Sequence, residues 1–162
     1  MRPTAALLLA ALFAGCVSTR TAEFEGLSIP SGSNVAVVRV PAAPDSARAA
    51  VARALRQAGY AVDAEGDGVR TALRLVGSGV LLAVHADVAP AASGSVVEVR
   101  GYWRPGGTRG RLVRFVEPGD DSTERAQWSA TDRPYSYAFG RVAELAALIP
   151  EASVTYAQER ER

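Results

Sequence analysis

The chain has no lysine, and among its 162 residues there is only one cysteine, one histidine and one asparagine. A single cysteine excludes an intramolecular disulfide. A conventional zinc site needs several His and Cys ligands, so one copy of each excludes that site too. The sequence also has no P-loop, no zincin motif and no nucleophile elbow. We therefore predict no catalytic residues, no cofactor and no metal.

An excess of charge of one sign is absent as well. The 18 arginines and 17 acidic residues give a net charge of +1. Residues 1–15 contain Arg2 and no acid, so the remainder carries 17 arginines against 17 acids. A nucleic-acid-binding protein needs a basic excess on some face, so we expect no nucleic-acid partner.

The chain begins with a short apolar stretch. Residues 5–14 carry no charge, but a transmembrane helix needs about 20 apolar residues. Arg2 precedes the stretch, and Phe13, Ala14, Gly15 and Cys16 close it. This pattern is typical of a secretory signal peptide.

The ending of that stretch resembles a bacterial lipobox. Ala14, Gly15 and Cys16 match it, whereas Phe13 stands where leucine is usual. The resemblance implies cleavage between Gly15 and Cys16 and attachment of lipid, with acyl chains such as palmitate, to Cys16. Val17 in place of aspartate resembles the default sorting to the outer membrane, facing the periplasm. The inner membrane and the cell surface are the alternatives.

The remaining sequence predicts one domain. We expect a signal peptide at residues 1–15, a lipidated cysteine and tether at 16–33, a single domain at 34–150 and a flexible charged tail at 151–162. Phe24, Leu27 and Ile29 either dock onto the domain or stay free with the tether.

Two helices are expected from apolar stripes at helical spacing. The first covers residues 46–58, with Asp45 as its N-cap and Gly59 after its end. The second begins near Pro134 and runs to about Leu148, and Pro150 ends it.

Alternating segments predict strands at residues 34–40, 60–65, 69–75, 80–88 and 95–104, and a further one at 111–117. Short turns between them favour an antiparallel meander. Only one face of this sheet is apolar. The expected fold is therefore an α+β two-layer sandwich, in which a meander of five to six strands carries both helices on one face.

The other face is polar and is our candidate partner surface. His85 could act as a base only with a nucleophile and an orienting carboxylate nearby, so a solvated ladder with Asp87 and Glu98 is the simpler interpretation. Aromatic residues often anchor interfaces; we expect Trp103 and Phe139 in the core, and Tyr102 and Trp128 at the surface. The candidate surface comprises Arg70, Arg74, His85, Asp87, Glu98, Arg100, Tyr102 and Trp128.

Two loops were weighed as ion sites. Glu117, Asp120, Asp121 and Glu124 could hold calcium through oxygen ligands, but their spacing is not that of an EF-hand. Residues 106–110 could cradle an anion, but no clear helix follows them. A solvated loop and a hairpin turn are the simpler interpretations.

Residues 54–71 run through a helix end, Gly-aromatic, a strand, an acidic turn, Gly-x-x-Thr and a second strand. This order resembles the helix-to-sheet step in small domains of outer-membrane lipoproteins such as BamC, an accessory subunit of the β-barrel assembly machinery. One such domain fits here, where BamC has two. The resemblance implies a non-enzymatic envelope role and carries over no functional residue.

Three functions are compatible with this sequence. The leading one is a structural or assembly lipoprotein that holds an envelope protein partner. The second is a binding module for a small molecule, lipid or peptidoglycan fragment, in a groove near Trp128 and Tyr135. The third is a hydrolase centred on His85.

Overall fold

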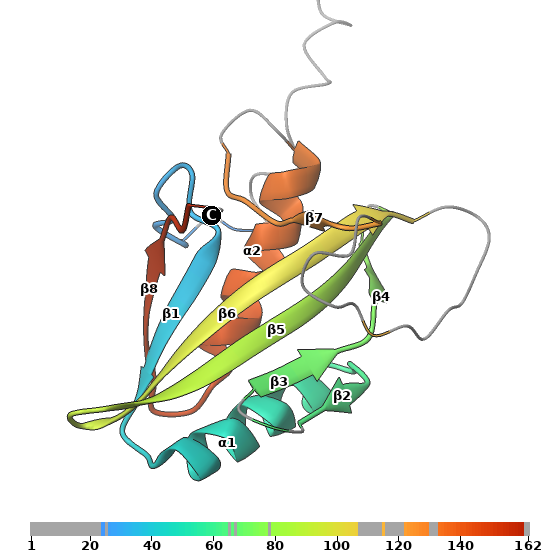
Figure 1. The fold of residues 1–162 in the computed structure, drawn as a ribbon. Helices are drawn as coiled ribbons and strands as arrows, with labels where there is room; N and C mark the ends of the chain where they lie inside the picture. Colours follow the sequence, from blue (N-terminus) through green and yellow to red (C-terminus); the bar gives the residue numbers. More distant parts are fainter. Residues whose placement is uncertain are drawn as a thin grey trace, which may run out of the picture.

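In the part of the chain that the computed structural model describes, eight strands form one antiparallel sheet with two helices on one side (Figure 1). The predicted α+β two-layer sandwich is confirmed. The structure describes residues 24, 26–64, 66, 68–77, 79–106, 115, 122–129 and 133–160. The predicted signal peptide, which ends at Gly15, and the predicted lipidation site Cys16 lie outside these residues.

The sheet combines the predicted meander with added strands. Its main order is β2-β3-β5-β6-β1-β8, with β4 beside β5 and β7 beside β6. The first four strands of that order form the meander, while β1 and β8 extend the sheet beyond β6. The elements are β1 (Val35–Val40), α1 (Pro44–Gln57), β2 (Val62–Asp63), β3 (Gly68–Thr71), β4 (Arg74–Val76), β5 (Val80–Ala91), β6 (Gly94–Pro105), β7 (Glu124–Arg125), α2 (Arg133–Ala147) and β8 (Ser153–Ala157).

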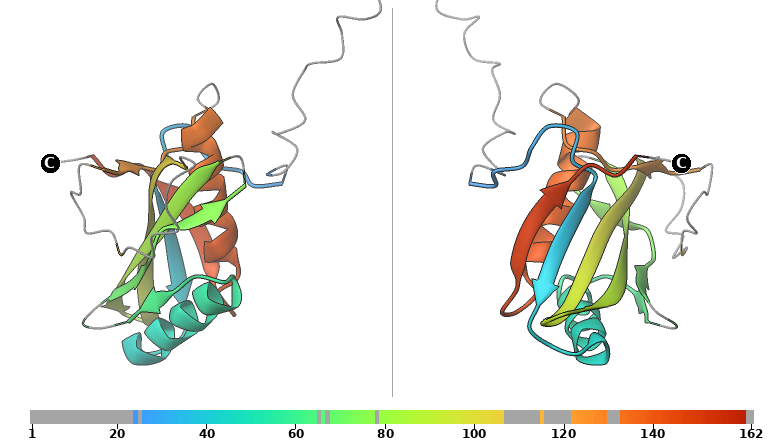
Figure 2. Two further views of the ribbon diagram at one scale, coloured as in Figure 1. Left: turned by 90° about the vertical axis from the view of Figure 1, so that its right-hand side faces the viewer. Right: turned by 60° about the vertical axis from the view of Figure 1, so that its left-hand side comes forward.

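Both helices lie on the same side of the sheet, as the left view of Figure 2 shows. Helix α1 packs on β2, β3 and β5, and α2 packs across β1, β5, β6 and β8. The core fills the space between the two layers. Phe139 and Val142 of α2 and Leu82 of β5 are fully buried there, and burying each such side chain contributes about 1.5–3 kcal/mol.

The N-terminal end of α1 differs from the prediction, whereas its C-terminal end agrees with it. Asp45 is not the N-cap: Ala43 takes that position without a side-chain cap, and Pro44 begins the helix. Proline suits this position because its missing N–H would have no partner there. Gly59 does follow the helix end, with φ +84°. The Tyr60 N–H donates to the Leu55 carbonyl at 3.0 Å, which closes a Schellman motif.

A β-bulge between β3 and β4 changes the face of the residues that follow it. Arg70 faces His85 and Arg74 faces Leu82, so four steps on one strand match three on β5. One extra residue moves the subsequent side chains to the opposite face. Strict alternation along the predicted strand at 69–75 would put Leu73 and Leu75 in the core with Val69, and that expectation is wrong. Leu73 packs on the helix-free face against Ala83, and Leu75 is 62% exposed.

The described part of the predicted tether, from Phe24 onward, belongs to the domain. Phe24 and Ile29 are buried, which decides the alternative that the sequence left open. The Phe24 ring packs against Tyr137 and Trp128, with centroid distances of 5.8 and 6.1 Å. A Cβ on Gly140 would stand 2.6 Å from the Phe24 ring, so the glycine lets the ring approach the α2 backbone.

The C-terminal segment also joins the sheet, where the sequence predicted a flexible tail. Strand β8 pairs with β1, with Val38 facing Val154 and Ala36 facing Tyr156. Tyr156 packs edge-on against Phe139 at 6.2 Å. Of the predicted strand at 111–117, Phe115 forms an isolated bridge with Ala72, and the other residues lie outside the described part.

The closest approach between the layers gives a test of this packing. A Cβ on Gly101 would stand 2.5 Å from Val142 Cγ2. We expect Gly101→Ala to lower the free energy of unfolding by about 1–3 kcal/mol, as overpacking does. In a Val142→Ala background the same change should cost less than half as much, because the obstructing methyl group is gone. Denaturant unfolding of the four proteins measures this, and equal costs in both backgrounds would contradict it.

Candidate functional site

The face of the sheet that the helices leave open carries polar side chains at facing positions. Figure 1 is viewed from this side, with α2 behind the sheet. Arg70 faces His85, which faces Arg100, and Asp87 faces Glu98. Alternate residues of a strand share a face, so these five side chains lie together. With the residues that contact them they form the polar face: Asp63, Arg70, His85, Asp87, Glu98, Arg100, Tyr102, Arg125 and Glu159.

Arg100 is the centre of the polar face. Its side chain is 11% exposed and forms ion pairs with three carboxylates. Nη1 donates to Asp87 at 2.6 Å and Nε donates to Glu159 at 2.9 Å, while Nη2 donates to Glu98. Burial opposes the charged form of the guanidinium, but the hydrogen bonds with Glu159 and Glu98 hold the pKa of Arg100 above its ordinary value. The Arg100 cation therefore has a structural role.

Glu159 fastens the C-terminal segment to the polar face. Its carboxylate accepts from Arg100 and from Arg125 of β7. These hydrogen bonds lower the pKa of Glu159 to about 2, against a smaller opposing effect of burial. The Asn34 side chain holds the backbone of the same residue: its amide donates to the Glu159 carbonyl at 2.8 Å and accepts from the Glu159 N–H at 2.7 Å.

His85 lies within the ladder and is 4% exposed. Its ring packs on Tyr102 with 4.6 Å between centroids and a 46° tilt. Arginines face it from both neighbouring strands. A general base must reach the proton it abstracts, and a ring so covered gives a substrate little access. The geometry favours a cross-strand ladder over a catalytic base, but the ladder is buried at His85 and not solvated as expected.

Two residues of the candidate surface lie elsewhere. Arg74 was expected on the polar face, but the bulge turns it to the helix side. There its guanidinium stacks over Tyr60 at 5.2 Å and donates to the Ala58 carbonyl. Trp128 is half-buried, packs on Phe24 and exchanges backbone hydrogen bonds with residues 32 and 33. It therefore holds the N-terminal segment, and the polar face does not include it.

Sequence reasoning missed Arg125, Glu159 and Asn34. Arg125 lies in a segment read as a polar loop, and Glu159 in one read as a tail. The alternation of Val154, Thr155 and Tyr156 was the available signal for a strand next to Glu159. No local pattern indicated Asn34, since its partner is 125 residues away.

Little in the described part of the structure supports the two candidate ion sites. Within the described ranges no three His, Cys, Asp or Glu side chains are grouped to hold a metal ion, and Arg100 occupies the space between Asp87, Glu98 and Glu159. Glu124 accepts a hydrogen bond from Tyr135 Oη. Glu117, Asp120 and Asp121, and most of residues 106–110, lie outside the described part.

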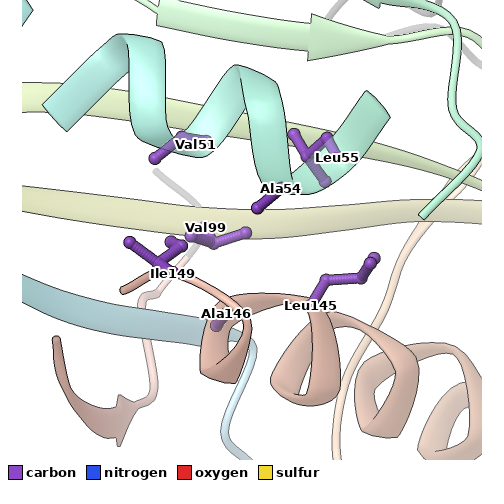
Figure 3. A pocket seen from close by; sticks show the side chains of 7 residues that line it. All are labelled: Val51, Ala54, Leu55, Val99, Leu145, Ala146 and Ile149. Atoms are coloured by element: carbon purple, nitrogen blue, oxygen red, sulfur yellow. The ribbon is translucent and has the colours of Figure 1, made fainter. Parts of the chain in front are cut away.

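A pocket between α1 and α2 is shown in Figure 3. Its cavity volume is about 10 Å³, which is room for about one water. Drug-sized ligands occupy pockets of about 300–1,000 Å³. The residues that line it are all apolar: Val51, Ala54, Leu55, Val99, Leu145, Ala146 and Ile149.

Both residues named for the suggested groove pack against other aromatic rings of the described part. Tyr135 packs edge-on against Trp103 with 4.9 Å between centroids, and Trp128 against Phe24. As expected, Trp103 and Phe139 are buried in the core.

Comparison with protein-family models, with curated proteins and with solved structures finds no match. None of the described helices is both long and apolar enough to cross a membrane.

The Glu159 ion pairs predict a pH dependence of stability. Folding lowers the pKa of Glu159 from 4.5 to about 2. Its stabilisation is therefore complete above about pH 4.5 and is lost as the pH falls towards 2. We expect Glu159→Gln to cost about 1 kcal/mol at pH 7, a small value because solvent screens a half-exposed carboxylate. Thermal unfolding at pH 7, 4.5 and 3 should show the variant and the parent converging.

Glu151→Gln is the matched control for that measurement. Glu151 is exposed and forms no ion pair with any residue in the described ranges. Its substitution should change stability by less than about 0.5 kcal/mol at each pH. A Glu159→Gln deficit that persists unchanged at pH 3 would contradict the assigned role.

Proposed function

We propose that this protein is a non-catalytic lipoprotein of the bacterial cell envelope, with a structural or assembly role through a protein partner. Lipid on Cys16 would hold it in the outer membrane, with the domain in the periplasm. The observation that carries the proposal is the docking of Phe24 into the domain, eight residues after Cys16. Eight residues span at most about 29 Å when fully extended, so a lipid on Cys16 would keep the domain at the membrane surface.

The sequence supports the anchor independently of the fold. Ala14, Gly15 and Cys16 match the lipobox, after an apolar stretch of secretory length. Several acyl chains bind a membrane far more firmly than one, since each buried CH₂ contributes about 0.8 kcal/mol. The resemblance of residues 54–71 to BamC-like domains favours the same location, and these residues form the end of α1 followed by β2 and β3.

The polar face supports a role without catalysis. Its central cation, Arg100, is engaged by three carboxylates, and its histidine is covered by Tyr102. A catalytic group has to be available to a substrate, whereas these groups bind one another and hold strands and the C-terminal segment together.

The same face has the composition of a protein interface. Asp87 is 71% exposed and Glu98 is 47% exposed around the buried Arg100. Next to them an apolar cluster contains Leu73, Leu81 and Tyr102. An aromatic and apolar centre beside charged groups is the usual arrangement of interface surfaces. A partner with basic side chains around an apolar segment would complement it.

The competing binding-module function has less support. The pocket between the helices has room for about one water. Near the suggested groove, Trp128 packs against Phe24 and Tyr135 against Trp103.

The anchor is tested by moving the thiol. Cys16→Ser should abolish incorporation of labelled palmitate and release the protein from the membrane fraction, because no other cysteine exists. The double variant Cys16→Ser/Ser18→Cys is the control for a thiol at the wrong distance from Gly15, and it should remain unlabelled. Labelling of the double variant, or of Cys16→Ser, would contradict lipidation through the lipobox.

The partner surface is tested by site-specific crosslinking in cells. A photoreactive residue at Tyr102 should yield one reproducible protein adduct in the envelope fraction, because the proposed partner covers that position. Adding Glu98→Arg should reduce the adduct at least fivefold by reversing the rim charge. The same photoreactive residue at Ala49, on the exposed side of α1, is the control. Equal adducts from both positions, or no protein adduct at Tyr102, would contradict the proposal.

A further inference from the structure

The helix side of the domain carries a basic patch, which we define as Arg53, Arg56 and Arg74. Arg53 and Arg56 are exposed and lie about 160° and 140° around α1 from the buried Val51, so they point away from the sheet. Arg74 stacks over Tyr60 just beyond the C-terminal end of α1 and donates to Ala58. Neither Arg53 nor Arg56 forms an ion pair within the described part of the chain. The patch is therefore available to an external anion.

This basic patch is continuous with the place where the N-terminal segment docks. The Arg74 guanidinium lies 5.2 Å from the Tyr60 ring centroid. Burial raises the pKa of Tyr60 to about 12, and the positive charges of Arg74 and Arg141 act against that rise. Arg141 in turn lies 5.9 Å above the Phe24 ring. Arg141 itself is paired with Glu144 at 2.7 Å, whereas the three patch arginines form no ion pair with any residue in the described ranges.

The N-terminal segment and the C-terminal segment approach opposite sides of the sheet. The left view of Figure 2 shows the segment before β1 beside α2 on the helix side, and the segment after β8 on the other side of the sheet. The eight residues from Cys16 to Phe24 reach at most about 29 Å. Placing the polar face on the membrane would require them to pass a helix about 10–12 Å wide and the sheet behind it, which uses most of that length.

We propose that the helix side of the domain rests on the membrane, with Arg53, Arg56 and Arg74 against anionic phospholipid headgroups. This inference depends on the proposed lipidation of Cys16. It places the anchor and the basic patch on one surface and leaves the polar face directed away from the membrane. Anionic headgroups attract nearby arginines, and the attraction falls off within about one Debye length.

The test uses the full-length lipidated protein in vesicles of 30% phosphatidylglycerol and 70% phosphatidylcholine. Because lipid would block Cys16, a cysteine introduced by Ala49→Cys or Ser153→Cys is the only free thiol and takes a fluorophore. Ala49 lies on the exposed side of α1, and Ser153 lies on the opposite side of the sheet, facing Arg39. Headgroup-labelled quencher lipids should quench the label at Ala49 several-fold more than the label at Ser153.

Charge variants distinguish an effect of the basic patch from an effect of the net charge. Arg53→Gln/Arg56→Gln should lower the population of the helix-side orientation about 25-fold, since each arginine near an anionic surface contributes about fivefold. Arg39→Glu changes the net charge equally on the polar side and should leave the quenching difference intact. Pure phosphatidylcholine vesicles should reduce the difference as the double variant does.

The outcomes distinguish this inference from the proposed function. A protein that fails to float with the vesicles would overturn both. A protein that floats, but whose Ser153 label is quenched as strongly as the Ala49 label, would overturn the orientation alone. So would a quenching difference that survives Arg53→Gln/Arg56→Gln, or a basic patch that crosslinks in cells to an acidic protein and not to lipid.

Discussion

The register of the β5–β6 hairpin is the constraint on which both surfaces of the sheet depend. Val84 faces Gly101 and Ala86 faces Val99 on the helix side, while between them His85 faces Arg100 on the polar side. A slip of one residue would exchange the two sets. It would bury Arg100 under α2 and expose the apolar row. The same register therefore determines both the packing of the core and the assembly of the polar face.

Arg100 links this hairpin to the C-terminal end of the domain. A buried cation is costly unless it is fully paired, and three carboxylates from β5, β6 and the C-terminal segment supply the pairing. Asn34, just before β1, holds the backbone of Glu159. The last described residues are thus bound to the centre of the sheet, and β8 is held against β1 at the sheet edge. These charged groups, which in the sequence resemble a reactive cluster, instead hold the strands and the C-terminal segment together.

The faces of the strands could be predicted because alternation is local. Val69, Val84 and Val99 are buried where the pattern put them. Leu73 and Arg74 were assigned to the wrong faces because a bulge inserts one residue, and periodicity carries no sign of it. Strand β8 was missed because five residues between charged segments give a weak pattern. The docking of Phe24 stayed open, since it depends on a glycine 116 positions later in the chain, at Gly140.

By itself the sequence determined the fold class, the two helices and the division of the sheet into an apolar and a polar face. These follow from repeats of two and 3.6 residues, which the backbone geometry imposes over short stretches. The tertiary structure alone decided the strand order, the partners of Arg100, the position of Arg74 and the docking of both chain ends. Those contacts join residues up to 125 positions apart, and they depend on register and on the space left between packed layers, which no local repeat encodes.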